Sequence, residues 1–344
     1  MTTTDPTKDA ERKRNEQYWR QVNLLARSYL QLQQTRVGGD LRLLSMEDQY
    51  LKDEGLLQIT EEIKIDEITG AKTISRKKKF VDESETGKLA VEKAKQEIMG
   101  SDPYRILNDH VAALNKQEDA LLKDAVNLAK GSELHDLCLR VKGWGAVATL
   151  TLMGYINPVT MTSPAKMWSN FGLTPSSRMR KGVQANYNPK IKGRLWMITR
   201  NVIMAQDPYY TFFYYAKKEY YKKRPDLLAR KEQKPKGWNA MINAMAYRVM
   251  MKIMLSNAWE IIYESYHGTK WSDNPDYRQH RNYIPPKPID ETLWKPIHER
   301  YAVSQNMLIE ELEGRYPDKE LVEKEPILLE EYMTYMKNAK IQLD

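Results

Sequence analysis

The chain has 344 residues and a formal net charge of +8, with 41% hydrophobic and 29% charged residues. This composition is typical of a folded protein with a charged surface, and the length favours about two domains. No apolar run reaches the roughly 18 residues that cross a bilayer, and residues 1–6 do not begin a secretory signal. We therefore expect no membrane partner and a location in the cytoplasm.

The N-terminal 100 residues predict a first domain made of helix and hairpin. Residues 8–36 are expected to form a long helix that Gly38-Gly39 ends. Residues 59–80 change to a strand pattern around Thr69-Gly70, which predicts a β-hairpin. The basic run at 76–79 in its second arm is either a solvated strand edge or a phosphate contact. A short helix is expected at 86–99.

A second domain is predicted over 101–265, beginning with a capped helix at 103–130. Apolar residues follow a heptad that only Glu118 interrupts: Leu107, Val111, Leu114, Leu121, Ala125 and Leu128. A stripe of this kind packs on another helix, either in the same chain or in a second copy. Together with a similar stripe between Tyr18 and Leu32, it favours a homo-oligomer.

Two short helices, at 134–141 and 147–155, flank a glycine turn and predict a helix-hairpin-helix element. The turn residues that we assign to nucleic-acid binding are Lys142, Gly143, Gly145 and Ala146. Glycine would allow positive φ and close approach of a phosphate, and the next helix would point its N-terminus at the anion. The alternative is an ordinary tight turn between helices.

Positive charge is concentrated between Arg178 and Lys236, where 16 Lys and Arg face 4 Asp and Glu, a net +12. The rest of the chain therefore sums to −4. Such a block predicts a polyanionic partner, DNA or else RNA, bound through its phosphates. The residues of the block assigned to this role are Arg178, Arg180, Lys181, Lys190, Lys192, Arg194, Lys222, Lys223 and Arg224. We expect the first six on a loop or ribbon and the last three at a helix end.

Helices are also expected at 196–223 and 239–263. The first contains eight aromatic residues between Tyr209 and Tyr221, most of which we expect in the core, with a few free to stack on bases. A methionine-rich face on the second is expected to be core. Residues 266–344 then form a third segment, with a proline-rich connector to 298 and an acidic helical tail that either covers the basic block or is solvated.

No catalytic constellation is evident. Ser176 and Ser177 are fallback nucleophiles, but no base is placed to activate them, so we favour turn serines. Five scattered histidines and the single Cys138 give no metal-ligand spacing, so no metal or cofactor is expected. Cys138 lies among leucines, which predicts a buried thiol.

The order of these elements resembles the C-terminal domain of DEDD insertion-sequence transposases and Piv-type DNA invertases, over roughly 103–260. The motifs that carry the resemblance are the Gly-x-Gly turn, Gly172-Leu173-Thr174-Pro175-Ser176, Lys190-x-Lys192-Gly193-x-Leu195, Asp207-Pro208-Tyr209, and Lys234-Pro235-Lys236 before a helix.

The resemblance implies a helical domain that grips DNA and, in members that use one, a guide RNA. The family's catalytic serine precedes a glycine shortly after the Gly-Leu-Thr-Pro element, and here Met179, Arg180 and Lys181 precede Gly182. The family's RNase H-like domain with its four carboxylates has no counterpart in residues 1–100. The resemblance thus favours a transposase-derived DNA-binding protein without recombinase activity. An active recombinase using a displaced serine and a self-assembling virion or filament subunit are the alternatives.

Overall fold

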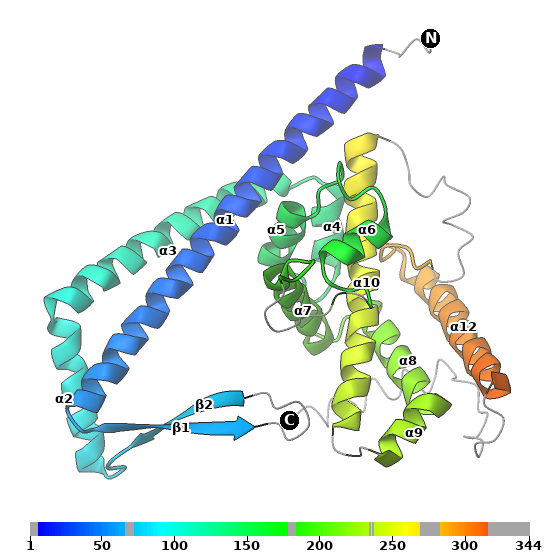
Figure 1. The fold of residues 1–344 in the computed structure, drawn as a ribbon. Coiled ribbons are helices and arrows are strands. Elements are labelled where there is room, and N and C mark those ends of the chain that lie inside the picture. Colours follow the sequence, from blue (N-terminus) through cyan, green and yellow to red (C-terminus); the bar gives the residue numbers. More distant parts are fainter. Residues whose placement is uncertain are drawn as a thin grey trace. The chain divides into compact units, whose positions relative to one another are not determined.

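The computed structural model describes residues 6–65, 72–175, 177, 184–233, 235, 237–268 and 283–315 (Figure 1). These residues are mostly helical, with one two-stranded antiparallel sheet near the N-terminus, so the predicted mainly α class and β-hairpin are confirmed. By packing, the chain divides into a unit of residues 28–124 and a unit of residues 1–27 with 125–344. The predicted three-part division at 100 and 265 stays a prediction.

Residues 28–124 are organised by the pairing of α1 (Pro6–Asp53) with α3 (Asp102–Ala129). Glu118, which interrupts the predicted heptad, is only 7% exposed. Its carboxylate accepts hydrogen bonds from the Tyr29 hydroxyl and the Gln33 amide, each at 3.3 Å, and pairs with Arg36. A buried charge is stable where donors surround it in this way.

The expectation that Gly38-Gly39 ends the first helix is wrong, because α1 continues through both glycines to Asp53. A Cβ added to Gly39 would lie 2.5 Å from Cγ2 of Val111 in α3. No atom lies within 4 Å of a Cβ added to Gly38. Gly39 therefore serves a close approach of two helices. Glycine costs a helix only about 1 kcal/mol, which the packing of α1 can offset.

The hairpin pairs β1 (Leu57–Ile65) with β2 (Lys72–Phe80), so that Leu57 lies opposite Phe80 and Ile65 opposite Lys72. The turn at Thr69-Gly70 lies outside the described residues. The predicted short helix is α2 (Glu85–Gly100), capped by the Ser84 hydroxyl. In the basic arm, Lys77 to Lys79 are exposed and Lys78 pairs with Asp48.

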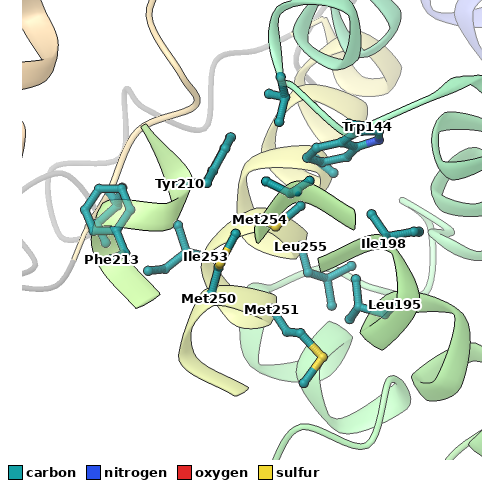
Figure 2. Packing of buried hydrophobic residues seen from close by; sticks show 14 of the residues in the cluster. Trp144, Leu195, Ile198, Tyr210, Phe213, Met250, Met251, Ile253, Met254 and Leu255 are labelled. Atoms are coloured by element: carbon teal, nitrogen blue, oxygen red, sulfur yellow. The ribbon is translucent and has the colours of Figure 1, made fainter. Parts of the chain in front are cut away.

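The larger unit is built around α10 (Trp238–His267), which packs against five of its helices. These are α4 (Glu133–Arg140), α5 (Ala146–Tyr155), α6 (Pro164–Asn170), α7 (Pro189–Met204) and α8 (Tyr210–Lys223). Figure 2 shows methionines of α10 packed between Leu195 and Ile198 of α7 and the aromatic residues of α8. The predicted methionine core and the buried Cys138 are confirmed.

The aromatic residues of α8 lie in this core, as expected for most of them, since all eight between Tyr209 and Tyr221 are buried. The predicted continuous helix over 196–223 is wrong, because α7 ends at Met204 and α8 begins at Tyr210. α7 ends where Gln206 takes a positive φ of 55° and the backbone N–H of Asp207 donates to the carbonyl of Val202. α8 begins because the carboxylate of Asp207 accepts the backbone N–H groups of Tyr209 and Tyr210 at 3.1 and 3.0 Å. Such side-chain capping starts a new helix.

Asp207 and Lys287 form a buried ion pair, with the ammonium 2.7 Å from Oδ2 and the side chains 0% and 5% exposed. The same ammonium donates to the carbonyl of Arg140 at 2.7 Å and lies over the ring of Trp294. Oδ2 also accepts the backbone N–H of Lys142. The pair thus joins three separate stretches of chain in one polar cluster.

The connector is fixed to the body by further hydrogen bonds from buried side chains. The Tyr209 hydroxyl donates to the carbonyl of Pro285, and the Asn257 amide donates to that of Ile284, both at 2.7 Å. A 3-10 turn η2 (Glu291–Leu293) then leads into α12 (Trp294–Arg315), which packs on α8, while α9 (Pro225–Gln233) follows α8. The expected irregular stretch to 298 is therefore too long, and the tail beyond 315 lies outside the described residues.

Substituting the two glycines of α1 separates helix propensity from packing. Gly38→Ala should raise the free energy of unfolding by about 1 kcal/mol, since alanine is the better helix former. Gly39→Ala should lower it, because overpacking against Val111 costs about 1–3 kcal/mol and outweighs that gain. Urea unfolding followed by circular dichroism measures both. Equal stabilisation by the two variants would refute the close helix contact.

Removing the ammonium of the buried pair tests the polar cluster. Lys287→Met should cost about 3–5 kcal/mol of unfolding free energy, because the carboxylate of Asp207 is left buried and unpaired. The matched control is Lys295→Met, whose ammonium is exposed and lies 3.9 Å from Glu299. If both variants unfolded at the same urea concentration, the buried pair of Asp207 and Lys287 would contribute no more to stability than an exposed ion pair.

Candidate nucleic-acid interface

One surface of the larger unit brings together cations and aromatic rings from α7 and α10. Lys192, Trp196 and Arg200 follow one another at intervals of four residues, so they form a stripe along α7. The matching residues on α10 are Tyr247, Arg248 and Lys252, which lie on adjacent turns. We call these six residues the cationic seam.

Arg248 repels two other cations of the seam, Lys192 and Lys252. Arg248 and Lys252 are one turn apart on α10, and the charge of Arg248 reaches both Lys192 and Lys252. Burial, and then that charge, lowers the pKa of each of these lysines. Within the part of the chain that the structure describes, no carboxylate lies within ion-pair distance of Lys192, Arg248 or Lys252.

Aromatic rings lie beside these cations. Trp196, 41% exposed, stacks on Tyr247 with ring centroids 5.7 Å apart and an interplanar angle of 19°. The guanidinium of Arg200 is 5.9 Å from the Trp196 ring centroid. The ammonium groups of Lys192 and Lys252 lie 4.9 Å from the rings of Tyr187 and Trp168. Cations held against aromatic faces are a common feature of sites that bind bases and phosphates.

The α7 stripe exists because the helix begins earlier than the sequence suggested. The side chain of Asn188 accepts the N–H groups of Lys190 and Ile191, and Pro189 occupies the first turn. Both are standard helix-starting residues. The expectation that Lys190, Lys192 and Arg194 lie on a loop or ribbon is therefore wrong.

The glycine turn between α4 and α5 is built for internal packing at Gly143. This residue has φ +82°, and an added Cβ would lie 2.3 Å from the carbonyl oxygen of Asn201 in α7. The N–H of Lys142 donates to Asp207, and that of Trp144 donates to the carbonyl of Val141. These two N–H groups point inward, so the turn has a structural explanation that needs no phosphate.

The other residues of the turn are open to solvent. Lys142, Gly145 and Ala146 are exposed, and no atom lies within 4 Å of a Cβ added to Gly145. Gly145 caps α5 without a side-chain hydrogen bond, which leaves the first N–H groups of the helix available. Gly143 contacts α7 at Asn201, which is one residue after Arg200. Asn201 is nine residues after Lys192, so the two lie about 13 Å apart along the axis of α7.

The cations at the end of α8 are largely engaged within the protein. The ammonium of Lys222 lies 2.6 Å from Oε1 of Glu219. The guanidinium of Arg224 makes a bidentate pair with the carboxylate of Asp226, with N–O distances of 2.9 and 2.7 Å. Lys217 donates to Gln305 of α12, with its ammonium 3.7 Å from the ring centroid of Tyr220. Burial lowers the pKa of Lys217 to about 7. Lys223 has no carboxylate partner among the described residues.

Several predicted residues lie outside the described part of the chain: Ser176, Arg178, Arg180 and Lys181. The other fallback serine, Ser177, is 8% exposed, and its hydroxyl is 2.7 Å from that of Thr174. This hydrogen bond fits a serine that stabilises a turn. It does not place a base beside the hydroxyl.

Sequence reasoning missed Trp196, Arg200, Tyr247, Arg248 and Lys252. Arg248 and Lys252 lie beyond the block that ends at Lys236, within a helix read as apolar core. One signal was present: two cations spaced by four residues interrupt a methionine-rich helix without a neighbouring acid. Its meaning depends on α7, because the residues that face Arg248 come from a helix about 50 residues earlier.

The pH dependence of stability tests the burial of Lys217. Its folded pKa of about 7 is well below the ordinary value of about 10.4. Between these values the unfolded chain holds more protons, so the free energy of unfolding should rise as pH increases from 7 to 9. Lys217→Met should flatten that rise, measured by urea unfolding at several pH values, and Lys223→Met should keep it. An unchanged pH dependence in Lys217→Met would show that the lysine is solvated.

Comparison of the chain with protein-family models, curated proteins and solved structures found no match. The resemblance to transposases and invertases therefore stays a prediction. Each helix in the described ranges is too short or too polar to cross a lipid bilayer. In the same ranges, no group of three or more His, Cys, Asp and Glu side chains could hold a metal ion.

Proposed function

We propose that this protein binds nucleic acid, most directly DNA, through the cationic seam of α7 and α10. The observation that carries the proposal is the gathering of Lys192, Arg248 and Lys252 without a carboxylate partner in the described chain. Like charges one turn apart destabilise a helix by about 0.2–0.5 kcal/mol. A polyanion relieves this repulsion, and its bound counterions are released in exchange.

The aromatic residues of the seam favour a nucleic acid over an acidic protein as the polyanionic partner. Trp196 is exposed and rests on Tyr247, so the ring is held at the surface by packing. An acidic protein would gain little from a rigid exposed indole, whereas a nucleobase stacks on such a ring. The seam thus offers both phosphate contacts and a stacking surface.

Two further features support the proposal. Arg178, Arg180 and Lys181, which lie outside the described residues, precede the first residue of α7 by 8 to 11 positions and add to the positive charge of this stretch of sequence. The exposed N-terminus of α5, after Gly145, is a second place where a phosphate could bind. The resemblance to the DNA-gripping domain of transposases and invertases agrees with this reading. We propose that the chain keeps that binding role without recombination, because the serine expected before Gly182 is absent.

One observation favours the alternative of a self-assembling protein. Val37, Leu41 and Leu44 of α1 are 42%, 61% and 53% exposed, at the spacing of one helix face. The heptad positions predicted to join copies are instead partly or fully buried; Val111, Leu114 and Ala125 of α3 are at most 9% exposed. Light scattering without nucleic acid, over a range of protein concentrations, tests assembly independently of binding.

Neutralising the seam tests the proposed function. If about six phosphates are neutralised, the wild-type protein should bind duplex DNA with a log–log salt slope near −5. The variant Lys192→Gln, Arg248→Gln, Lys252→Gln should bind more weakly, and its slope should be less steep by about 2.7. Fluorescence anisotropy at several salt concentrations measures both quantities.

The matched control removes the same charge from exposed lysines of the other unit, with Lys88→Gln, Lys93→Gln and Lys116→Gln. It should keep the wild-type slope. A seam variant that binds as the control does, or a wild-type affinity that ignores salt, would contradict the proposal.

A further inference from the structure

An open hollow of about 880 Å³ lies next to the seam, between α6 and the start of α7. Its lining includes Lys166, Ser169 and Asn170 of α6, together with Gln184, Asn186 and Tyr187 of the segment before α7. The volume is in the range of ligand sites in proteins, about 300–1,000 Å³. No carboxylate lines it among the described residues.

The walls of the hollow are fixed by the packing of Tyr187. The ring lies against Gly172, where φ is +71° and an added Cβ would be 2.3 Å from Cδ2 of Tyr187. The backbone N–H of Asn188 donates to the carbonyl of Asn170 at 3.4 Å, which joins the two sides. The ammonium of Lys192 lies 4.9 Å from the centroid of the same ring, so Tyr187 both lines the hollow and contacts a residue of the seam.

The polar groups of the hollow suit a neutral partner with donors and acceptors. The side-chain amides of Asn170, Gln184 and Asn186 are exposed and make no hydrogen bond to any other described residue. Lys166, the one cation among the described residues that line the hollow, donates to the hydroxyl of Thr162 at 2.9 Å. An amide presents a donor beside an acceptor, which is the pattern on the edge of a nucleobase.

We infer that the hollow receives one unpaired nucleobase, whose phosphate lies on Lys192, and this rests on the proposed nucleic-acid binding at the seam. A base held in a duplex exposes only its groove edges, so entry into a hollow requires a single strand or an extruded nucleotide. The preferred ligand is therefore single-stranded nucleic acid, with a neighbouring base stacked on Trp196.

The test uses the full chain and two probes, a 20-nucleotide mixed-sequence single strand of DNA and the duplex of the same sequence. The variant Asn170→Ala, Gln184→Ala, Asn186→Ala should weaken single-strand binding about tenfold or more, as for lost base-edge hydrogen bonds. Duplex affinity and both salt slopes should stay at wild-type values, because no charge is removed. The matched control, Asn108→Ala, Asn115→Ala, Asn239→Ala, removes exposed amides elsewhere and should bind as wild type.

The outcomes separate this inference from the function on which it rests. Unchanged single-strand binding in the amide variant, with loss in the seam variant, overturns the base site and leaves nucleic-acid binding in place. Equal weakening of both probes, or a wild-type protein that prefers neither, also overturns the base site. Salt-independent binding to both probes overturns the proposed function itself.

Discussion

The fold of the larger unit depends on the burial of one carboxylate, that of Asp207. It accepts two N–H groups of the first turn of α8, one N–H group of the turn after α4, and the ammonium of Lys287. A fully buried carboxylate is tolerated only when its oxygens are satisfied in this manner. The same carboxylate therefore starts α8 and fixes the connector to the core.

The position of the seam follows from this arrangement and from the apolar character of α10. Because α10 is buried over most of its second half, the helices around it have little freedom to shift. α7 packs on α10 through Leu195 and Ile198, which leaves the stripe of Lys192, Trp196 and Arg200 beside Arg248. The cations are thus brought together by apolar packing rather than by any acidic neighbour. An arrangement that costs electrostatic energy in the free protein is a reason to look for a ligand.

Local signals in the sequence predicted much of the fold. The hairpin at 57–80, the helix that starts at Asp102 and the buried aromatic residues of α8 follow from strand pattern, capping and hydrophobicity. The errors arose where tertiary contacts decide. Gly39 lies in a helix where Val111 packs closely on it, whereas the helix predicted over 196–223 is interrupted at Gln206 and restarted by the carboxylate of Asp207. The contact of Gly39 with Val111 leaves no local trace in the sequence. Asp207-Pro208 does leave one, because a capping residue followed by proline is a standard helix start, but its meaning as a helix boundary was missed.

The candidate site was predicted less well, for the same reason. A count of charges located the basic block but could not separate Lys222 and Arg224, which pair with Glu219 and Asp226, from Lys192, which has no carboxylate partner in the described chain. It also excluded Arg248 and Lys252, which only the packing of α10 on α7 places beside Lys192. Pairing and proximity, rather than composition, decide which cations remain available to a ligand.

The most direct measurement is the protection of lysines from acetylation when single-stranded DNA is bound, followed by mass spectrometry. Lys192 and Lys252 should react several-fold more slowly in the complex at low salt, and they should regain their free reactivity at high salt. Lys88 and Lys93 should react equally in both states. Equal reactivity of Lys192 and Lys252 with and without DNA would contradict the account.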